Sequence, residues 1–465
     1  MSMGRRQEES QGALWVSARD VAVTPGHPFY RRLNKLLEKH DFDGFAESIC
    51  QPYYARTMGR PSIPPGVYFR MLMVGYFEGL DSERGICWKV ADSRSLGEFL
   101  GFGPAEATPT HVSLLNTRNR LPVEVHRELF TYVLALLAKE GLLKGKTLGV
   151  DATTLEANAA LRSIVRKDTG EDYTEYLKRL AAASGVETPT KEDLIRFDRS
   201  RKGKKMSNEE WEHPHDSDAR IGMTKRGACD MIHKCEAASD METGAVVAVT
   251  VQAADLGDTE TVGETALAAV ENLAAVAERE EEAFPALSRR PASEMVADKG
   301  YHSNDCLSRL EDGLVRTYIS EPERGQRNWT GKASERDTVY ANRRRIRGER
   351  GKRLFRLRGE ICERNFAHLF ESGGMRRTHL RTHAKIIKRL LVHVCGFNLG
   401  LVMRKLFGDG TPRGMAERRA AFSDVWGCLR LLLGALGKRF RCQPAIFPSS
   451  NAGSGFSCAA RIVAA

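Results

Sequence analysis

Residues 296–303 read VADKGYHS, and this stretch ends an apolar segment on an acid. The lead-in, Met295–Ala297, has the character of a short buried strand that stops at Asp298. A carboxylate in that position is costly to remove from water unless a cation or a hydrogen-bond donor pairs with it. The stretch therefore predicts a strand of an α/β sheet whose end carries an acid in need of a partner.

A second acid follows a similar strand earlier in the chain. The segment KTLGV, residues 146–150, predicts a short apolar strand that ends at Asp151. Ligands of α/β proteins bind at the carboxyl ends of the strands. Each aspartate alone is equally compatible with a turn or a helix N-cap. Two of them, with a third acid from a helix, favour a metal site.

The third acid comes from a helix predicted over residues 356–370, which offers Glu360 and Glu363. Glu360 has Arg356 and Arg364 at four-residue spacing, so ordinary helical ion pairs satisfy it. Glu363 has no cation within helical reach. We therefore expect Glu363 to be the ligand and Glu360 to be structural, with Glu360 as the alternative.

Three carboxylates on separate elements suit phosphodiester cleavage. Two Mg²⁺ ions about 4 Å apart activate a nucleophile and stabilise the leaving oxygen. Mg²⁺ prefers oxygen ligands and keeps several waters, so a few carboxylates suffice. Bound Mg²⁺ would also supply the partner that Asp151 and Asp298 need.

Other polar residues compete less well for a place in this site. Asp258 is interpreted as a helix cap, with an approach to the site as the alternative. Tyr301 is expected to pack against the strand end, and His302 to lie on the surface. His213 and His215 are interpreted as part of a polar loop rather than as metal ligands.

The charge of the chain is concentrated in one segment. The 465 residues carry a net charge of +11, and residues 324–405 alone hold 22 Lys or Arg against 6 Asp or Glu, a balance of +16. All other residues therefore sum to −5. An excess too large for mutual pairing favours a nucleic-acid surface over a merely solvated face.

Neither a secreted nor a membrane protein is indicated. The ten cysteines include no C-x-x-C pair, which is typical of a reduced intracellular protein. The N-terminus lacks an apolar signal core, and the most apolar stretch, residues 386–403, contains Lys388 and Arg389. We expect a cytoplasmic protein.

The pattern of elements predicts four parts. Residues 1–26 are expected to be flexible, and 27–145 to form short helices compatible with a helix-turn-helix DNA-binding domain. Residues 146–408 predict a mixed α/β domain, with a polar insertion at about 162–222 and a basic loop before residue 356. Residues 409–465 predict a C-terminal helix and a disordered tail.

Three motifs together resemble the DDE transposases of bacterial insertion sequences: LGVDATTLEANAA, VADKGYHS and GEICERNFAHLFESGGMRRTHLR. The helical start, from GRPSIPPGVYF to LLNTRNRL, is similar to the N-terminal domain of the same proteins. The resemblance covers about residues 25–410. It implies an RNase H-like catalytic core in which Asp151, Asp298 and Glu363 are the catalytic residues and the metal ligands.

The resemblance also implies an activity and partners. These are binding to terminal inverted repeats, cleavage that depends on two Mg²⁺ ions (with Mn²⁺ as a substitute), and strand transfer through a 3′-hydroxyl. The expected partners are the transposon ends, target DNA and further copies of the chain in a homodimer or higher oligomer. The expected location is the cytoplasm, at the nucleoid, away from membranes.

The sequence departs from the family pattern around the glutamate. Gly359 and Phe370 stand at positions where many relatives carry residues that handle DNA ends. Phosphate contacts are therefore assigned only generically, to Arg364, Arg376, Arg377, Lys385 and Lys388. Two alternatives stay open: a nuclease of the same fold that cuts without joining, and an inactive remnant that only binds DNA.

Overall fold

The computed structural model describes residues 2–3, 26–57, 59–103, 106–185, 188–202, 206–279, 287–325 and 327–418. Met1–Gly414 forms one compact unit and Met415–Ala465 a second. The predicted flexible N-terminus lies outside the described residues, apart from 2, 3 and 26, and so does the predicted tail from residue 419 onward.

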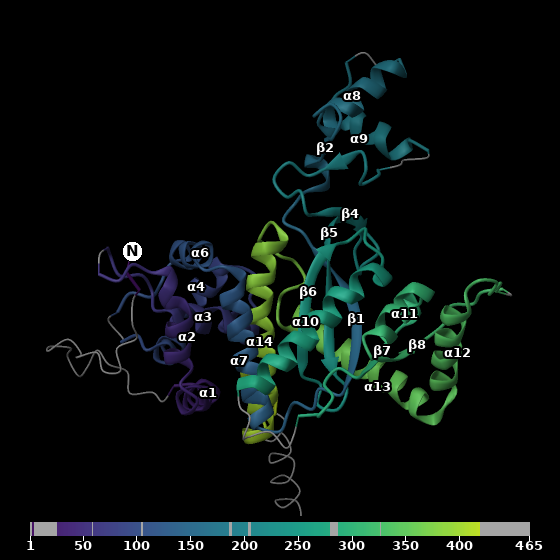
Figure 1. Ribbon diagram of the computed structural model, residues 1–465. Helices are drawn as coiled ribbons and strands as arrows, with labels where there is room; N and C mark the ends of the chain where they lie inside the picture. The colour runs from purple at the N-terminus through teal and green to yellow at the C-terminus, as the bar shows by residue number, and fades with distance from the viewer. Residues whose placement is uncertain are drawn as a thin grey trace, which may run out of the picture. The chain divides into compact units, whose positions relative to one another are not determined.

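A six-stranded mixed sheet forms the middle of the first unit (Figure 1). Its strands are β1 (Thr147–Glu156), β4 (Arg220–Met223), β5 (Cys229–Asp240), β6 (Val246–Ala253), β7 (Glu294–Ala297) and β8 (Arg316–Ile319). Their order is β4-β5-β1-β7-β8, with β6 also paired to β5. β5 is antiparallel to β1 and β6, whereas β7 is parallel to β1 and β8. The predicted mixed α/β fold is confirmed.

The chain after β6 is mostly helical. Its helices are α10 (Asp258–Arg279), α11 (Asn304–Asp312), α12 (Ala333–Arg347), α13 (Glu349–Phe366) and α14 (His383–Phe407). The prediction of a basic loop before residue 356 is wrong, because most of that segment forms α12 and the start of α13. α12 buries Val339 and Asn342, and this narrow stripe is enough to hold a strongly charged helix on the protein.

Helices cover both faces of the sheet. The backbone of Gly149 on β1 faces Cys362 of α13, whose sulfur lies 3.3 Å from the position that a Cβ would take. Glu236 on β5 pairs with Ala152 and accepts a hydrogen bond from Thr261 of α10. Successive residues of a strand point to opposite faces. α13 and α10 therefore lie on opposite faces, and Asp151 shares the face of Gly149.

The elements of the described chain before β1 are all helices. Its α-helices are α1 (Pro28–Lys39), α2 (Phe42–Cys50), α3 (Pro65–Glu78), α4 (Glu83–Asp92), α5 (Arg94–Leu100), α6 (His111–Arg120) and α7 (Val123–Lys139). α3 is buried on all sides from Pro65 to Phe77. α14 packs against both α3 and α7 and also against β6, so it joins the helical part to the sheet. The buried guanidinium of Arg389 donates to the carbonyl of Leu72 at 2.7 Å along this contact.

The same helix is the one described helix that is long and apolar enough to cross a membrane. Of its most apolar window, 89% is buried inside the protein. Its hydrophobicity is thus accounted for by packing against its neighbours, as in the core helix of a globular protein.

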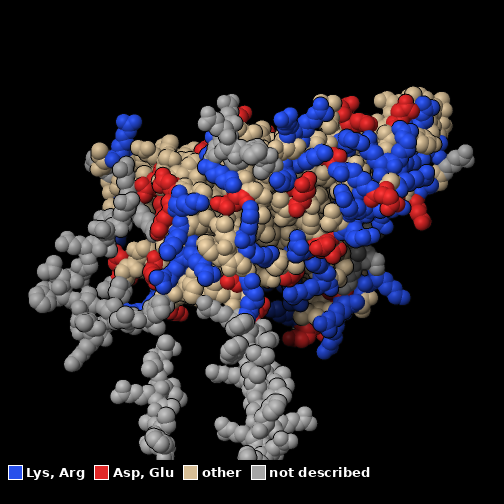
Figure 2. Space-filling view, turned by 90° about the horizontal axis from the view of Figure 1, so that it is seen from below, with Lys and Arg blue, Asp and Glu red and all other residues tan. Residues whose placement is uncertain are grey.

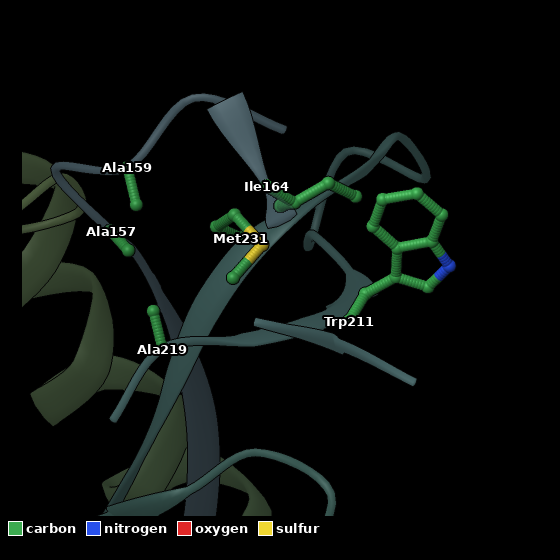
Figure 3. Close-up of a cluster of buried hydrophobic side chains, with 6 residues drawn as sticks. All are labelled: Ala157, Ala159, Ile164, Trp211, Ala219 and Met231. Atoms are coloured by element: carbon green, nitrogen blue, oxygen red, sulfur yellow. The ribbon is translucent and has the colours of Figure 1, made fainter. Parts of the chain in front are cut away.

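The predicted polar insertion after β1 contains its own small core. It consists of a two-stranded ribbon, β2 (Val165–Arg166) with β3 (Trp211–Glu212), and two helices, α8 (Tyr173–Ala183) and α9 (Lys191–Ser200). Trp211 and Ile164 are buried together with Met231, a residue of β5 (Figure 3). The insertion is therefore anchored on the sheet through apolar contacts.

Candidate active site

Asp151 lies within a strand and not at its end. β1 continues five residues beyond it to Glu156, because β5 keeps pairing with it as far as the Glu156–Ile232 pair. The prediction that the strand stops at Asp151 is therefore wrong. The side chain of Asp151 is 21% exposed, and its own carboxylate accepts a hydrogen bond from the N–H of Ala152 at 2.9 Å.

Asp298 follows β7 directly, as predicted. The strand ends at Ala297, and the carboxylate of Asp298 accepts a hydrogen bond from the N–H of Gly300 at 2.8 Å in a short 3₁₀ turn. Parallel pairing of β1 and β7 matches Gly149 with Val296. Two residues further along each chain come Asp151 and Asp298, so the register brings these two acids into the same neighbourhood of the sheet.

The surroundings of Asp151 confirm that other carboxylates are close. Burial raises the pKa of Asp151 above its ordinary value, and the negative charges of Asp298 and Asp258 raise it further. The guanidinium of Arg358 and the N–H of Ala152 act in the opposite direction. The net rise means that this carboxylate sits in a place where an added positive charge would be favourable.

Arg358 of α13 supplies one such charge. Its Nη1 lies 3.1 Å from Oδ2 of Asp151, and the side chain is 17% exposed. Nε and Nη1 of Arg358 make no well-formed hydrogen bond, so the contact is an ion pair of poor geometry. The partner of Asp151 in this structure is thus Arg358, which the sequence pattern did not indicate.

Glu363 lies on the same helix as Arg358, on an exposed flank. Ile361 packs with Met241, which follows β5 and donates its N–H to the carbonyl of Thr147 at the start of β1. Side chains two positions apart on a helix diverge by about 200°. Glu363 therefore points away from this contact and is exposed.

The choice between the two glutamates rests on their pairing. Arg364 lies 3.5 Å from Glu360, which confirms one of the predicted helical ion pairs. Arg356 forms no ion pair with a described residue, so the second predicted pair is absent there. Glu363 likewise has no ion pair or side-chain hydrogen bond within the described part of the chain.

Asp258 comes closer to the two aspartates than the sequence indicated. It begins α10, and its Oδ2 would lie 2.5 Å from a Cβ on Gly300, while Oδ1 of Asp298 would lie 3.0 Å from the same point. The two carboxylates are therefore close neighbours across Gly300. Lys234 of β5 holds the other oxygen of Asp258 at 2.6 Å. The position of Asp258, soon after the end of β6, was the available signal.

A buried network fixes the turn that carries Asp298. The hydroxyl of Tyr301 donates to Oε1 of Glu236 at 2.9 Å, and Thr261 donates to the same oxygen at 3.0 Å. Burial raises the pKa of both Glu236 and Tyr301. Tyr301 packs beneath the strand end, as expected. The expectation that His302 lies on the surface is wrong, because its side chain is buried and burial lowers its pKa.

The five predicted phosphate contacts have different surroundings. Arg376 donates to the carbonyl of Thr154 at 2.7 Å and also pairs with Glu371, and Lys388 donates to the carbonyl of Arg118 at 3.2 Å. These two cations hold parts of the protein together. Three others are exposed: Arg364, Arg377 and Lys385. Of these, Arg364 has the carboxylate of Glu360 as a partner.

The donor atoms around Asp151 decide which metal ion the site could hold. Within the described residues, no group of three or more His, Cys, Asp or Glu side chains is already arranged around a metal position. The acids whose charges act on Asp151, namely Asp298 and Asp258, offer only carboxylate oxygens, as Asp151 does, and these are the ligands that Mg²⁺ prefers. A cation, the guanidinium of Arg358, already lies against Asp151. The donor set thus fits Mg²⁺ in its chemistry.

Comparison with known families adds one match. A family model described as a transposase domain (DUF772) matches residues 18–120, a span that includes α1 to α6. Searches of curated proteins and of solved structures gave no match. The match supports a transposase, a class of protein that binds and cleaves DNA, and it covers the helical part rather than the sheet.

Proposed function

We propose that this protein is a DNA transposase of the DDE type with an RNase H-like catalytic core. The observation that carries the proposal is the parallel pairing of β1 with β7, which sets Asp151 beside Asp298. It occurs in a chain whose residues 18–120 match a transposase domain. The helical part would bind the terminal inverted repeats, and the sheet would carry the chemistry.

Asp151, Asp298 and Glu363 are the proposed ligands of two Mg²⁺ ions. When bound, these ions would activate the attacking water or 3′-hydroxyl and stabilise the leaving oxygen. The N–H groups of Ala152 and Gly300 keep the two aspartate carboxylates oriented. The guanidinium of Arg358 would move away from Asp151 as the site fills.

The third acid has two candidates. Glu363 is exposed and free of ion pairs among the described residues, and it lies on the helix that also carries Arg358, the partner of Asp151. Asp258 is nearer to Asp298, but Lys234 holds it. We favour Glu363, because a ligand that is not already paired can turn toward a metal at little cost.

A cleavage assay on supercoiled plasmid carrying the ends of the element tests this function. With Mg²⁺, the wild-type protein is expected to cut at the ends and to give joined products. Asp151→Asn, Asp298→Asn and Glu363→Gln should each lose cleavage and keep DNA binding. Glu360→Gln is the matched control, since its carboxylate is paired on the same helix, and it should cut normally.

The outcomes separate the alternatives. Normal cleavage by Asp298→Asn would show that Asp298 is not a catalytic ligand and would contradict the proposed site. Cleavage without joined products indicates a nuclease, and binding without cleavage by the wild type indicates an inactive remnant. Loss of cleavage in Asp258→Asn together with normal cutting by Glu363→Gln makes Asp258 the third ligand.

A further inference from the structure

The cations of α12 and α13 are not all used within the protein. The two helices carry eleven Lys or Arg and five Asp or Glu. Seven of the cations have a carboxylate partner, as Arg343 has Glu321 and Arg345 has Glu311. The other four are exposed and form no ion pair with a described residue: Arg344, Arg347, Arg353 and Arg356. We call these four side chains the arginine surface.

The helices that carry this surface are fixed to the sheet. Asn342 of α12 is fully buried and pairs twice with the backbone of Ile319 on the edge strand β8, donating at 2.8 Å and accepting at 3.1 Å. Arg345 donates to the carbonyl of Thr317 at 2.9 Å. The four arginines therefore stand on a rigid base, so that little backbone order is lost when they bind.

The two helices also meet closely enough to make one surface. A Cβ on Gly351 would lie 2.5 Å from the carbonyl of Arg345, so only glycine lets the first turn of α13 lie against the last turn of α12. The last turn of α12 carries Arg344 and Arg347. Arg353 and Arg356 follow within the first two turns of α13 and line a hollow of about 480 Å³.

The arginine surface shares a flank of α13 with Glu363, the proposed third ligand. Arg356 and Glu363 are seven residues apart, which places them on one flank of α13 at a separation of about 10 Å. Between them is Gly359, beside which a Cβ would meet no atom within 4 Å. Lys and Arg side chains gather over α12 and α13 in the space-filling view (Figure 2). Among the described residues, no atom therefore crowds the position between Arg356 and Glu363 on this flank.

We propose that the arginine surface binds the phosphate backbone of the duplex DNA that enters the active site. Arginine forms paired hydrogen bonds with phosphate, and unpaired exposed arginines need no internal bond to be broken before they bind. This inference rests on the proposed function, because the duplex in question is the DNA that the proposed active site near Asp151 would cleave. It moves the expected DNA contact from Arg376 and Lys388, which are engaged within the protein, to α12 and α13.

The test measures binding of the full chain to a 30-base-pair DNA duplex of unrelated sequence, by fluorescence anisotropy in EDTA at several KCl concentrations. Changing Arg344, Arg347, Arg353 and Arg356 together to Gln should weaken binding at least about tenfold near 100 mM salt. The slope of log K against log[KCl] is about −0.9 for each phosphate contact, so the loss of four contacts should make this negative slope shallower by roughly three to four. Variants with only the α12 pair or the α13 pair changed should each show about half of that change.

The control removes the same charge from the insertion. Lys178, Lys191, Arg196 and Arg199 are exposed on α8 and α9, and their change to Gln should leave the slope as it is in the wild type. Equal slopes for both fourfold variants, or no change in the arginine variant, overturn the proposal. So does a loss of affinity confined to an RNA duplex of the same length. The binding assay contains no Mg²⁺ and does not depend on cleavage. If the wild type fails to cleave plasmid in the separate Mg²⁺ assay, the proposed function is contradicted, whereas the measured role of the arginines in DNA binding is not.

Discussion

Replacement of Gly300, in the turn that follows β7, should destabilise the folded protein. In Gly300→Ala, the new Cβ would lie 2.5 Å from Oδ2 of Asp258 and 3.0 Å from Oδ1 of Asp298, where ordinary contacts begin near 3.4 Å. Both carboxylates are held in place, because Lys234 pairs with the other oxygen of Asp258 at 2.6 Å and the N–H of Gly300 donates to Oδ1 of Asp298 at 2.8 Å.

The expected change in the free energy of unfolding follows from two opposing effects. Gly300 does not have a positive φ, so alanine meets no backbone strain there. Crowding of this kind costs about 1–3 kcal/mol, and the reduced freedom of the unfolded chain returns about 0.4–1 kcal/mol. We expect a net loss of about 1–2 kcal/mol, and a fall of the melting temperature by roughly 2–8 °C at the 2–4 °C per kcal/mol of larger domains.

Thermal unfolding followed by circular dichroism checks this, with Gly263→Ala as the control. Gly263 is exposed on α10 with no atom near its Cβ position, so that variant should be slightly more stable than the wild type. In an Asp258→Ala background, Gly300→Ala should cost less, because one of the two crowded oxygens is gone. An unchanged melting temperature in Gly300→Ala, or the same loss in both backgrounds, refutes the reasoning.

Three further predictions concern other residues. Gly359→Ala should stabilise the protein by about 1 kcal/mol, since α13 gains a better helix former in open space, and a lower urea midpoint than that of the wild type contradicts this. Arg358→Gln should lower the melting temperature without Mg²⁺ and enlarge the rise that Mg²⁺ causes, because Asp151 loses its cation; an equal Mg²⁺ effect in both proteins counts against a metal at Asp151. Burial lowers the pKa of His126 and His393 to about 3, so the unfolded state takes up protons first as the pH falls below about 6.5. Stability should therefore be complete above that pH and fall toward pH 3, by up to about 1.4 kcal/mol per unit for each histidine, and His393→Gln should flatten the slope in urea titrations at several pH values.

Several features of the site were readable from local patterns. The apolar run before Asp298 predicts β7 and its end, and the four-residue spacing of Glu360 and Arg364 predicts their ion pair. The apolar spacing around Cys362 predicts α13 as a helix, although it begins earlier, at Glu349. Such patterns act over one or two turns or a few strand residues, so neighbouring residues decide them.

Other features depended on partners that are distant in the sequence. Asp151 is inside a long strand because β5, some 80 residues later, continues the ladder to Glu156. α12 forms despite its charge because Asn342 completes the edge of β8. No local pattern carries this information, because pairing register and edge contacts are set only when distant segments meet.

The sequence by itself determined that this is a mixed α/β protein with an acid directly after the strand that ends at Ala297 and a strong excess of cations between residues 324 and 405. Only the tertiary structure decided which charges are satisfied internally. It pairs Arg358 with Asp151, holds Asp258 with Lys234 beside Gly300, and leaves four arginines of α12 and α13 without a described partner. The reason is physical: the free energy of a charge depends on its burial and on the opposite charges within a few ångströms, and both are properties of the folded chain.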